Sequence, residues 1–277
     1  MVLIFFMKNT IILAFIFISF SGYAQSEEKV FFETMELVQR DSNYHNKNLT
    51  GQYITIYSDP LYTKDKQGRA YQINAKNEGG KFLILFHDVW GLTDDIVQEA
   101  ERLFVELNEN VTVIAPDLFD GKAPIDSTAA KKVLTQLKYD RVIEIVRALV
   151  KQTPNNSLIA TIGWGFGGGW ALEGGVIAFS KAAGCVMFYG LQDLTPERIS
   201  TLSAPVFGVF GREDLVSSPQ KVTDLEVFMS DNRKPFKVVT YDADRGFANF
   251  WSENFHNGKA NNANDLALKF LKERLSL

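Results

Sequence analysis

A glycine-rich stretch, GWGFGGGW at residues 163–170, has the spacing of a nucleophile elbow but lacks the nucleophile. In that motif, G-x-nucleophile-x-G, a Ser or Cys stands on a sharp turn between a strand and a helix. Gly165 stands at the centre of the stretch and has no side chain that could attack a substrate. The spacing therefore predicts the turn of an acyl-transfer site without the group that would form the acyl-enzyme. The alternative is a packing turn that never served catalysis.

Three ionisable residues follow other apolar runs. Asp88 comes directly after KFLILFH, Asp214 comes shortly after APVFGVFG, and Arg245 comes shortly after FKVVTYD. The carboxyl ends of parallel strands meet at one edge of a sheet, and sites form in the crevice beyond that edge. We therefore expect the site among the segments that follow the predicted strands, which are 88–90, 117–120, 163–168, 189–193, 212–214 and 242–249.

Strand-like and helix-like segments alternate from residue 51 onward. Strand patterns lie at 68–75, 81–92, 111–119, 158–165, 183–190, 204–211 and 236–242, and helical patterns at 93–110, 129–153, 168–180, 218–232 and 261–275. This alternation predicts an α/β fold with a mostly parallel central sheet and helices on both faces. No composition break or repeat divides the pattern, so we expect one domain over 52–277.

The first 24 residues have the features of a secretory signal peptide. Lys8 precedes an apolar stretch from Ile11 to Phe20, and small residues stand at the minus-three and minus-one positions before Gln25. The apolar stretch is too short for a membrane-spanning helix, which needs about 20 residues. A buried N-terminal strand is the alternative, and Met7 is a second candidate start. We expect 25–51 to be an N-terminal extension and the mature protein to be soluble, periplasmic or secreted.

Five stretches together resemble the dienelactone hydrolase family of α/β-hydrolases. They are LFHDVWGL, VIAPDLF, IGWGFGGGWAL, VFGREDLVSSPQKV and YDADRGFANF, and the resemblance runs from about Arg69 to Leu275. It implies the α/β-hydrolase fold and an ancestry in ester or lactone hydrolysis. It also implies a triad of an elbow Cys or Ser, an Asp after a late strand and a His in a following loop.

Carried onto this chain, the resemblance puts Gly165 at the nucleophile, Asp214 at the acid and Arg245 at the base. Asp88 matches a second acidic residue that orients the nucleophile, where Glu is usual. A guanidinium does not act as a general base near neutral pH, so we expect the family's acyl chemistry to be lost. We expect an ion pair between Arg245 and Asp214, bidentate in its best geometry; a solvent-facing Arg245 is the alternative.

The resemblance also implies an oxyanion hole formed by the Phe166 and Trp90 N–H groups. With Arg245 beside them, these donors predict a pocket for a small carboxylate or phosphate. Aromatic side chains are candidates for its apolar lining, namely Trp90, Trp164, Phe119 and Phe247.

Other chemistries have little support in the sequence. The His residues are His45, His87 and His256; we expect the His87 side chain to point away from that of Asp88, and His256 to lie on a surface loop. No Cys or His cluster has metal-ligand spacing and GWGFGG is a poor dinucleotide fingerprint, so we expect neither metal nor cofactor. Cys185, the only cysteine, lies in an apolar strand and is expected to be a buried thiol.

The net charge of −4 and the scattered basic residues give no reason to expect a nucleic-acid partner, nor a membrane partner after signal cleavage. These observations predict an exported dienelactone hydrolase-like protein that binds a small ligand, a carboxylate first, without family-type catalysis. An active ester or lactone hydrolase is the main alternative, using an unrecognised nucleophile or a water activated by Asp88 or Asp214 as the base. A structural partner with an empty cleft is a third.

Overall fold

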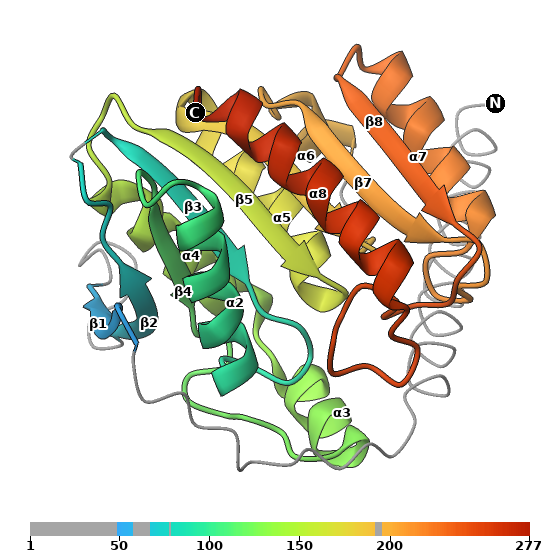
Figure 1. Cartoon of the computed structure of the whole chain (residues 1–277), viewed down its shortest axis with the longest axis horizontal. Coiled ribbons are helices and arrows are strands. Elements are labelled where there is room, and N and C mark those ends of the chain that lie inside the picture. Colours follow the sequence, from blue (N-terminus) through green and yellow to red (C-terminus); the bar gives the residue numbers. More distant parts are fainter. Residues whose placement is uncertain (1–48, 58–66, 78, 192–195) are drawn as a thin grey trace, which may run out of the picture.

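The structure, a computed structural model, describes residues 49–57, 67–77, 79–191 and 196–277 (Figure 1). The expected signal peptide, 1–24, and most of the expected extension, 25–51, lie outside the described residues.

The described strands form one eight-stranded sheet in the order β1-β2-β4-β3-β5-β6-β7-β8. The first two pairings, β1 with β2 and β2 with β4, are antiparallel, and every other pairing is parallel. The expected mostly parallel sheet is therefore confirmed. The strand bounds are β1 Gln52–Ile56, β2 Gly68–Ile73, β3 Lys81–Phe86, β4 Thr112–Pro116, β5 Leu158–Trp164, β6 Ala182–Phe188, β7 Val206–Gly211 and β8 Phe236–Tyr241.

Helices cover both faces of the sheet. In Figure 1, α2 and α8 cross one face, while α4 and α5 lie behind the strands on the other. The central strands are buried on both sides, which explains why their sequences are continuously apolar rather than alternating. The helix bounds are α2 Asp94–Glu106, α3 Ser127–Gln136, α4 Tyr139–Gln152, α5 Phe166–Ala178, the 3₁₀ turn η1 Phe179–Lys181, α6 Pro196–Ser200, α7 Pro219–Asp231 and α8 Asn257–Arg274.

The long helix expected at 129–153 is two helices, and this prediction was wrong. Leu137 has φ −66° and ψ 127°, and Lys138 has φ −90° and ψ 112°, so both are extended between α3 and α4. No Gly or Pro stands at this break. The apolar face of α4 packs on α5 and β1, so tertiary packing, not a local breaker, sets where the second helix begins.

Helix α8 begins four residues before its expected start. His256 is its N-cap, and its Nδ1 accepts a hydrogen bond from the Lys259 N–H at 3.4 Å. The exposed position expected for His256 is confirmed, but the residue caps a helix rather than lying within a loop. No described helix is long and apolar enough to cross a membrane.

Candidate functional site

Gly165 occupies the turn between β5 and α5. It is the N-cap of α5, with φ 55° and ψ −116°, and its N–H donates to the Phe188 carbonyl at 2.9 Å. A residue with a Cβ is strained in such a conformation, at a cost of about 1–3 kcal/mol, whereas glycine adopts it freely. The sharp strand-to-helix turn expected from the sequence is therefore present.

Neighbouring glycines allow backbone segments to touch at this turn. A Cβ on Gly163 would overlap the Gly167 carbonyl, and a Cβ on Gly167 would overlap the end of β3 at Phe86. A Cβ on Gly190 would overlap the Gly165 carbonyl. These glycines hold the first turn of α5 against the ends of β3 and β6.

The guanidinium of Arg245 lies over Gly165. Its Nη2 is 3.2 Å from the point that a Cβ on Gly165 would occupy. Its Nη1 donates to the Tyr189 carbonyl at 2.5 Å, to Asp214 Oδ2 at 3.3 Å and to Ser217 Oγ at 3.3 Å. Arg245 thus reaches from the loop after β8 to the turn after β5.

Asp214 is buried and held by backbone donors. Its Oδ1 accepts the N–H groups of Val216 at 2.7 Å and Ser217 at 2.9 Å, while Oδ2 faces Arg245. The expected ion pair is confirmed, but it joins one nitrogen, Arg245 Nη1, to one oxygen, Asp214 Oδ2, and is not bidentate. The remaining Nη1 contacts, to the Tyr189 carbonyl and Ser217, explain this geometry, because the same nitrogen serves three oxygens.

Asp88 follows the end of β3 and is held by two hydrogen bonds from neighbouring loops. Its Oδ1 accepts the Trp90 N–H at 2.9 Å, and its Oδ2 accepts Asn249 Nδ2 at 3.2 Å. The expectation that the Trp90 N–H serves an oxyanion therefore needs correction, because the Asp88 carboxylate already accepts from it. The Phe166 N–H is at the N-terminus of α5 as expected, and the Phe166 ring packs toward Phe119 and Trp170.

Tyr189 contributes a buried hydroxyl beside these charges. The hydroxyl has no hydrogen-bond partner among the described residues. Burial raises the pKa of Tyr189 well above its ordinary value; the positive charge of Arg245 lowers it, and Asp88 and Asp214 add to the rise. The phenol is therefore neutral at physiological pH, and its hydroxyl can both donate and accept hydrogen bonds.

His87 is a structural residue. Its Nδ1 lies 2.7 Å from the Asp88 carbonyl and its Nε2 accepts the Leu118 N–H at 3.0 Å. Nε2 accepts, so Nδ1 carries the proton in the neutral ring. Burial lowers the pKa of His87, which favours this neutral form. Its ring packs edge to face on Phe119, with centroids 4.7 Å apart.

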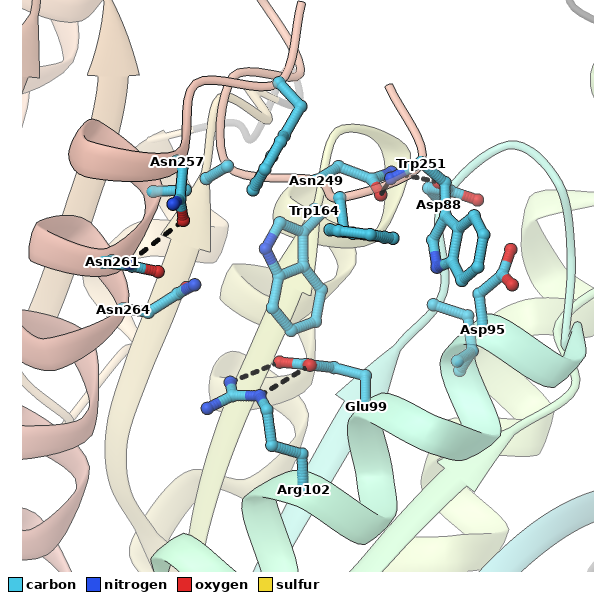
Figure 2. Close-up of a pocket in the computed structure, with 15 residues that line it drawn as sticks. Asp88, Asp95, Glu99, Arg102, Trp164, Asn249, Trp251, Asn257, Asn261 and Asn264 are labelled. Atoms are coloured by element: carbon cyan, nitrogen blue, oxygen red, sulfur yellow. Dashed lines mark hydrogen bonds and ion pairs between the residues drawn. The ribbon is translucent and has the colours of Figure 1, made fainter. Parts of the chain in front are cut away.

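A cavity of about 500 Å³ opens next to Asp88, between α2 and α8 (Figure 2). The loop after β8 covers one side, and Trp164 of β5 lies at its base. Of the aromatics expected to line a pocket, only Trp164 lines this cavity; Phe119 and Phe247 are buried in the core. The lining residues are Asp88, Asp95, Ile96, Glu99, Arg102, Trp164, Ala248, Asn249, Phe250, Trp251, Phe255, Asn257, Ala260, Asn261 and Asn264.

Most of the residues that line this cavity were not predicted from the sequence. Its polar walls come from two helices that carry their polar residues at i, i+4 and i+7: Asp95, Glu99 and Arg102 on α2, and Asn257, Asn261 and Asn264 on α8. Such spacing marks one helix face, but on a surface helix it equally marks solvent-facing residues. Only the packing of α2 beside α8 makes the two faces meet.

Metal-ligating and thiol chemistry are not apparent in the described part of the chain. No group of three or more His, Cys, Asp or Glu side chains there has an arrangement that would hold a metal ion. Cys185 is fully buried, and burial raises the pKa of its thiol to about 11.

Comparison with known proteins agrees with this fold. A family model described as the dienelactone hydrolase family matches residues 69–275. "Protein usf" of Aquifex pyrophilus is 24% identical over 208 residues, which cover 72% of this chain and 90% of that protein.

Solved structures share the fold at low identity. A dienelactone hydrolase-like promiscuous phosphotriesterase from metagenomic libraries has a TM-score of 0.66 at 15% identity, covering 81% of this chain and 98% of its own. An esterase of Pyrobaculum calidifontis has a TM-score of 0.59 at 13% identity, and the match covers 92% of this chain and 93% of the esterase. The fold is thus the α/β-hydrolase fold, and the chain belongs to the dienelactone hydrolase family.

Proposed function

We propose that this member of the family is an exported protein that binds a small ligand and does not carry out acyl-enzyme catalysis. The observation that carries the proposal is the position of Arg245, whose Nη2 lies 3.2 Å from where a Gly165 side chain would begin. A serine or cysteine would meet the guanidinium there. Glycine at a turn that strains other residues also suits a chain that keeps the elbow without using it.

The residues around Arg245 support this interpretation. Asp214 would orient a histidine base in a working triad, but here it pairs with a guanidinium that does not release its proton near neutral pH. Ser217, the hydroxyl nearest to this pair, is buried and donates to the Tyr189 carbonyl at 3.1 Å. Ser217 is therefore a poor substitute nucleophile.

A carboxylate ligand at Arg245 is part of the proposal. The N-terminus of α5 and the guanidinium are both positive. However, Nη1 already serves three oxygens, and the Trp90 N–H donates to Asp88. A thermal-shift screen with acetate, succinate, benzoate and phosphate tests the idea: stabilisation lost in Arg245→Met supports it, and no stabilisation by any anion counts against it.

Export rests on the residues before Gln25. The purified periplasmic or secreted protein should begin near Gln25 by N-terminal sequencing. An intact N-terminus on a cytoplasmic protein would contradict this part of the proposal.

Water-mediated ester or lactone hydrolysis is the second candidate. Asp88 favours it, because this carboxylate lines the cavity and is held by the Trp90 N–H and Asn249. One assay separates the candidates: the mature protein is incubated with activated esters and lactones. Binding without catalysis predicts rates at the uncatalysed background. Turnover well above background that is abolished by Asp88→Ala or Asp214→Ala would establish the hydrolase instead.

A further inference from the structure

The cavity between α2 and α8 has a lining that selects among ligand classes. Its volume of about 500 Å³ lies within the range of small-molecule sites, about 300–1,000 Å³. We propose that it binds a neutral polyhydroxylated ligand of the saccharide class. The inference goes beyond the proposed function, because it concerns this cavity and not the carboxylate proposed at Arg245.

The α8 wall supplies amides. Asn257, Asn261 and Asn264 follow one another along the face of α8 that borders the cavity, as Figure 2 shows. Asn261 Nδ2 donates to Asn257 Oδ1 at 3.1 Å, while the Asn264 side chain makes no hydrogen bond with any described residue. Each amide offers two donor hydrogens and an acceptor oxygen side by side, which suits a pair of neighbouring hydroxyls.

The base of the cavity supplies an indole. Trp164 is only 6% exposed, and its ring stacks on Phe188 with centroids 5.4 Å apart. Its N–H has no hydrogen-bond partner within the described ranges. Trp164 lines the cavity, so a ligand oxygen placed there would accept a hydrogen bond from the indole N–H.

The α2 wall argues against an anion. Glu99 accepts both Arg102 Nε at 2.8 Å and Arg102 Nη2 at 2.6 Å, so the one cation among the lining residues is already paired with a carboxylate. Asp88 and Asp95 add two further carboxylates to the lining. Three carboxylates against one guanidinium leave the cavity negative, which repels a carboxylate or phosphate.

The donors of the cavity argue against a simple cation. An ammonium ligand carries only donors, so it would leave the Trp164 N–H and the Asn264 amide hydrogens without acceptors. A hydroxyl both donates and accepts, and therefore satisfies amides, carboxylates and the indole together. An apolar ligand would leave all of these groups unpaired.

The loop after β8, which covers one side of the cavity, supplies aromatic side chains. Phe250 is 66% exposed and Trp251 is 40% exposed, and their rings meet edge to face with centroids 5.0 Å apart. Phe250 also contacts Phe255 at 5.3 Å. Exposed rings beside a polar cavity match the alternation of C–H faces and hydroxyl edges in a sugar.

The test is a binding titration of the mature protein. Glucose, galactose, xylose, N-acetylglucosamine, cellobiose and maltose are titrated while intrinsic tryptophan fluorescence is followed, since Trp164 and Trp251 both line the cavity. At least one saccharide should bind. Asn264→Ala and Trp164→Phe should each weaken that binding at least tenfold, the second by removing the N–H while keeping an aromatic ring.

Asn262→Ala is the matched control. Asn262 lies on the same helix, is exposed and does not line the cavity. Its Oδ1 instead accepts a hydrogen bond from the Tyr241 hydroxyl. Binding should be unchanged in this variant, and circular dichroism should confirm that all variants are folded. The inference is overturned if no saccharide binds, if tetramethylammonium binds where saccharides do not, or if Asn264→Ala leaves affinity intact. These readouts need no turnover, so they fail independently of the ester assay that tests the proposed function.

Discussion

Arg245 Nη2 stands 3.2 Å from the point at which a side chain on Gly165 would begin. A contact this short between a Cβ and a neighbouring heavy atom requires one of the two to move. The loop after β8 and the turn after β5 are therefore coupled, although 80 residues separate them in the chain. Two experiments exploit this coupling.

The first of these experiments measures the stability of the fold. Gly165→Ala should destabilise the fold by about 1–3 kcal/mol for the strained backbone alone, and by more because the methyl group meets Arg245. Gly121→Ala is the matched control: Gly121 also has a positive φ, 89°, but nothing lies within 4 Å of its would-be Cβ. Urea unfolding should show the larger loss at Gly165. Equal losses would mean that the guanidinium simply moves aside.

The second of these experiments measures catalysis. Gly165→Cys combined with Arg245→His places a thiol and an imidazole at the positions that the family resemblance assigns to nucleophile and base, with Asp214 still in place. The double variant should hydrolyse p-nitrophenyl acetate faster than either single variant, because nucleophile and base act as a unit. If the folded double variant is no faster than the single ones, the assignment of these positions is wrong.

The Arg245–Asp214 pair should matter more than a surface pair. Asp214 is fully buried, so Arg245→Met leaves a buried carboxylate without its cation. Breaking a wholly buried pair in this way lowers the free energy of unfolding by about 3–5 kcal/mol. We expect a smaller loss here, because the Arg245 side chain is 20% exposed. Arg212 and Asp242 form an exposed ion pair, with side chains 54% and 76% exposed. Arg212→Met should lower the free energy of unfolding by at most about 1 kcal/mol. Similar losses in denaturant unfolding would contradict this ranking.

His87 should make the protein sensitive to mild acid. Burial lowers its folded-state pKa below 6.5, so the unfolded chain binds a proton that the folded one does not. Stability is then fully present above pH 6.5 and falls as the pH drops below it, by up to about 1.4 kcal/mol per pH unit for one proton. His87→Gln, which keeps a donor and an acceptor without titrating, should flatten the curve between pH 6.5 and 5 in urea unfolding. An unchanged slope would exclude His87 as the cause.

Cys185 should be unreactive in the folded protein. Burial raises the pKa of its thiol to about 11, and the thiolate is the reactive form. A disulfide reagent such as DTNB at pH 8 should therefore label it only after denaturation. Gly175→Ala should speed the labelling, because a Cβ there would overlap Cys185 Sγ; rapid labelling of the unmodified protein would contradict the buried position.

The sequence by itself determined the fold class and the turn at Gly165. Continuous apolar strands separated by amphipathic helices allow few arrangements other than a parallel sheet covered on both sides, and glycines at 163, 165 and 167 mark a sharp turn. It also placed Asp88, Asp214 and Arg245 at one edge of that sheet, because strand ends of a parallel sheet meet there. The ion pair between Asp214 and Arg245 was expected from the family resemblance, in which the base position contacts the acid position.

Only the tertiary structure decided which partner each group has and where the cavity lies. Asn249 donates to Asp88 because the loop after β8 lies beside the end of β3, and no local spacing encodes a contact between residues so far apart in the chain. The amides of α8 and the charges of α2 form one cavity because two helices distant in the chain cross the same face of the sheet. Side-chain partners depend on distances between elements, and local sequence patterns record only the elements themselves.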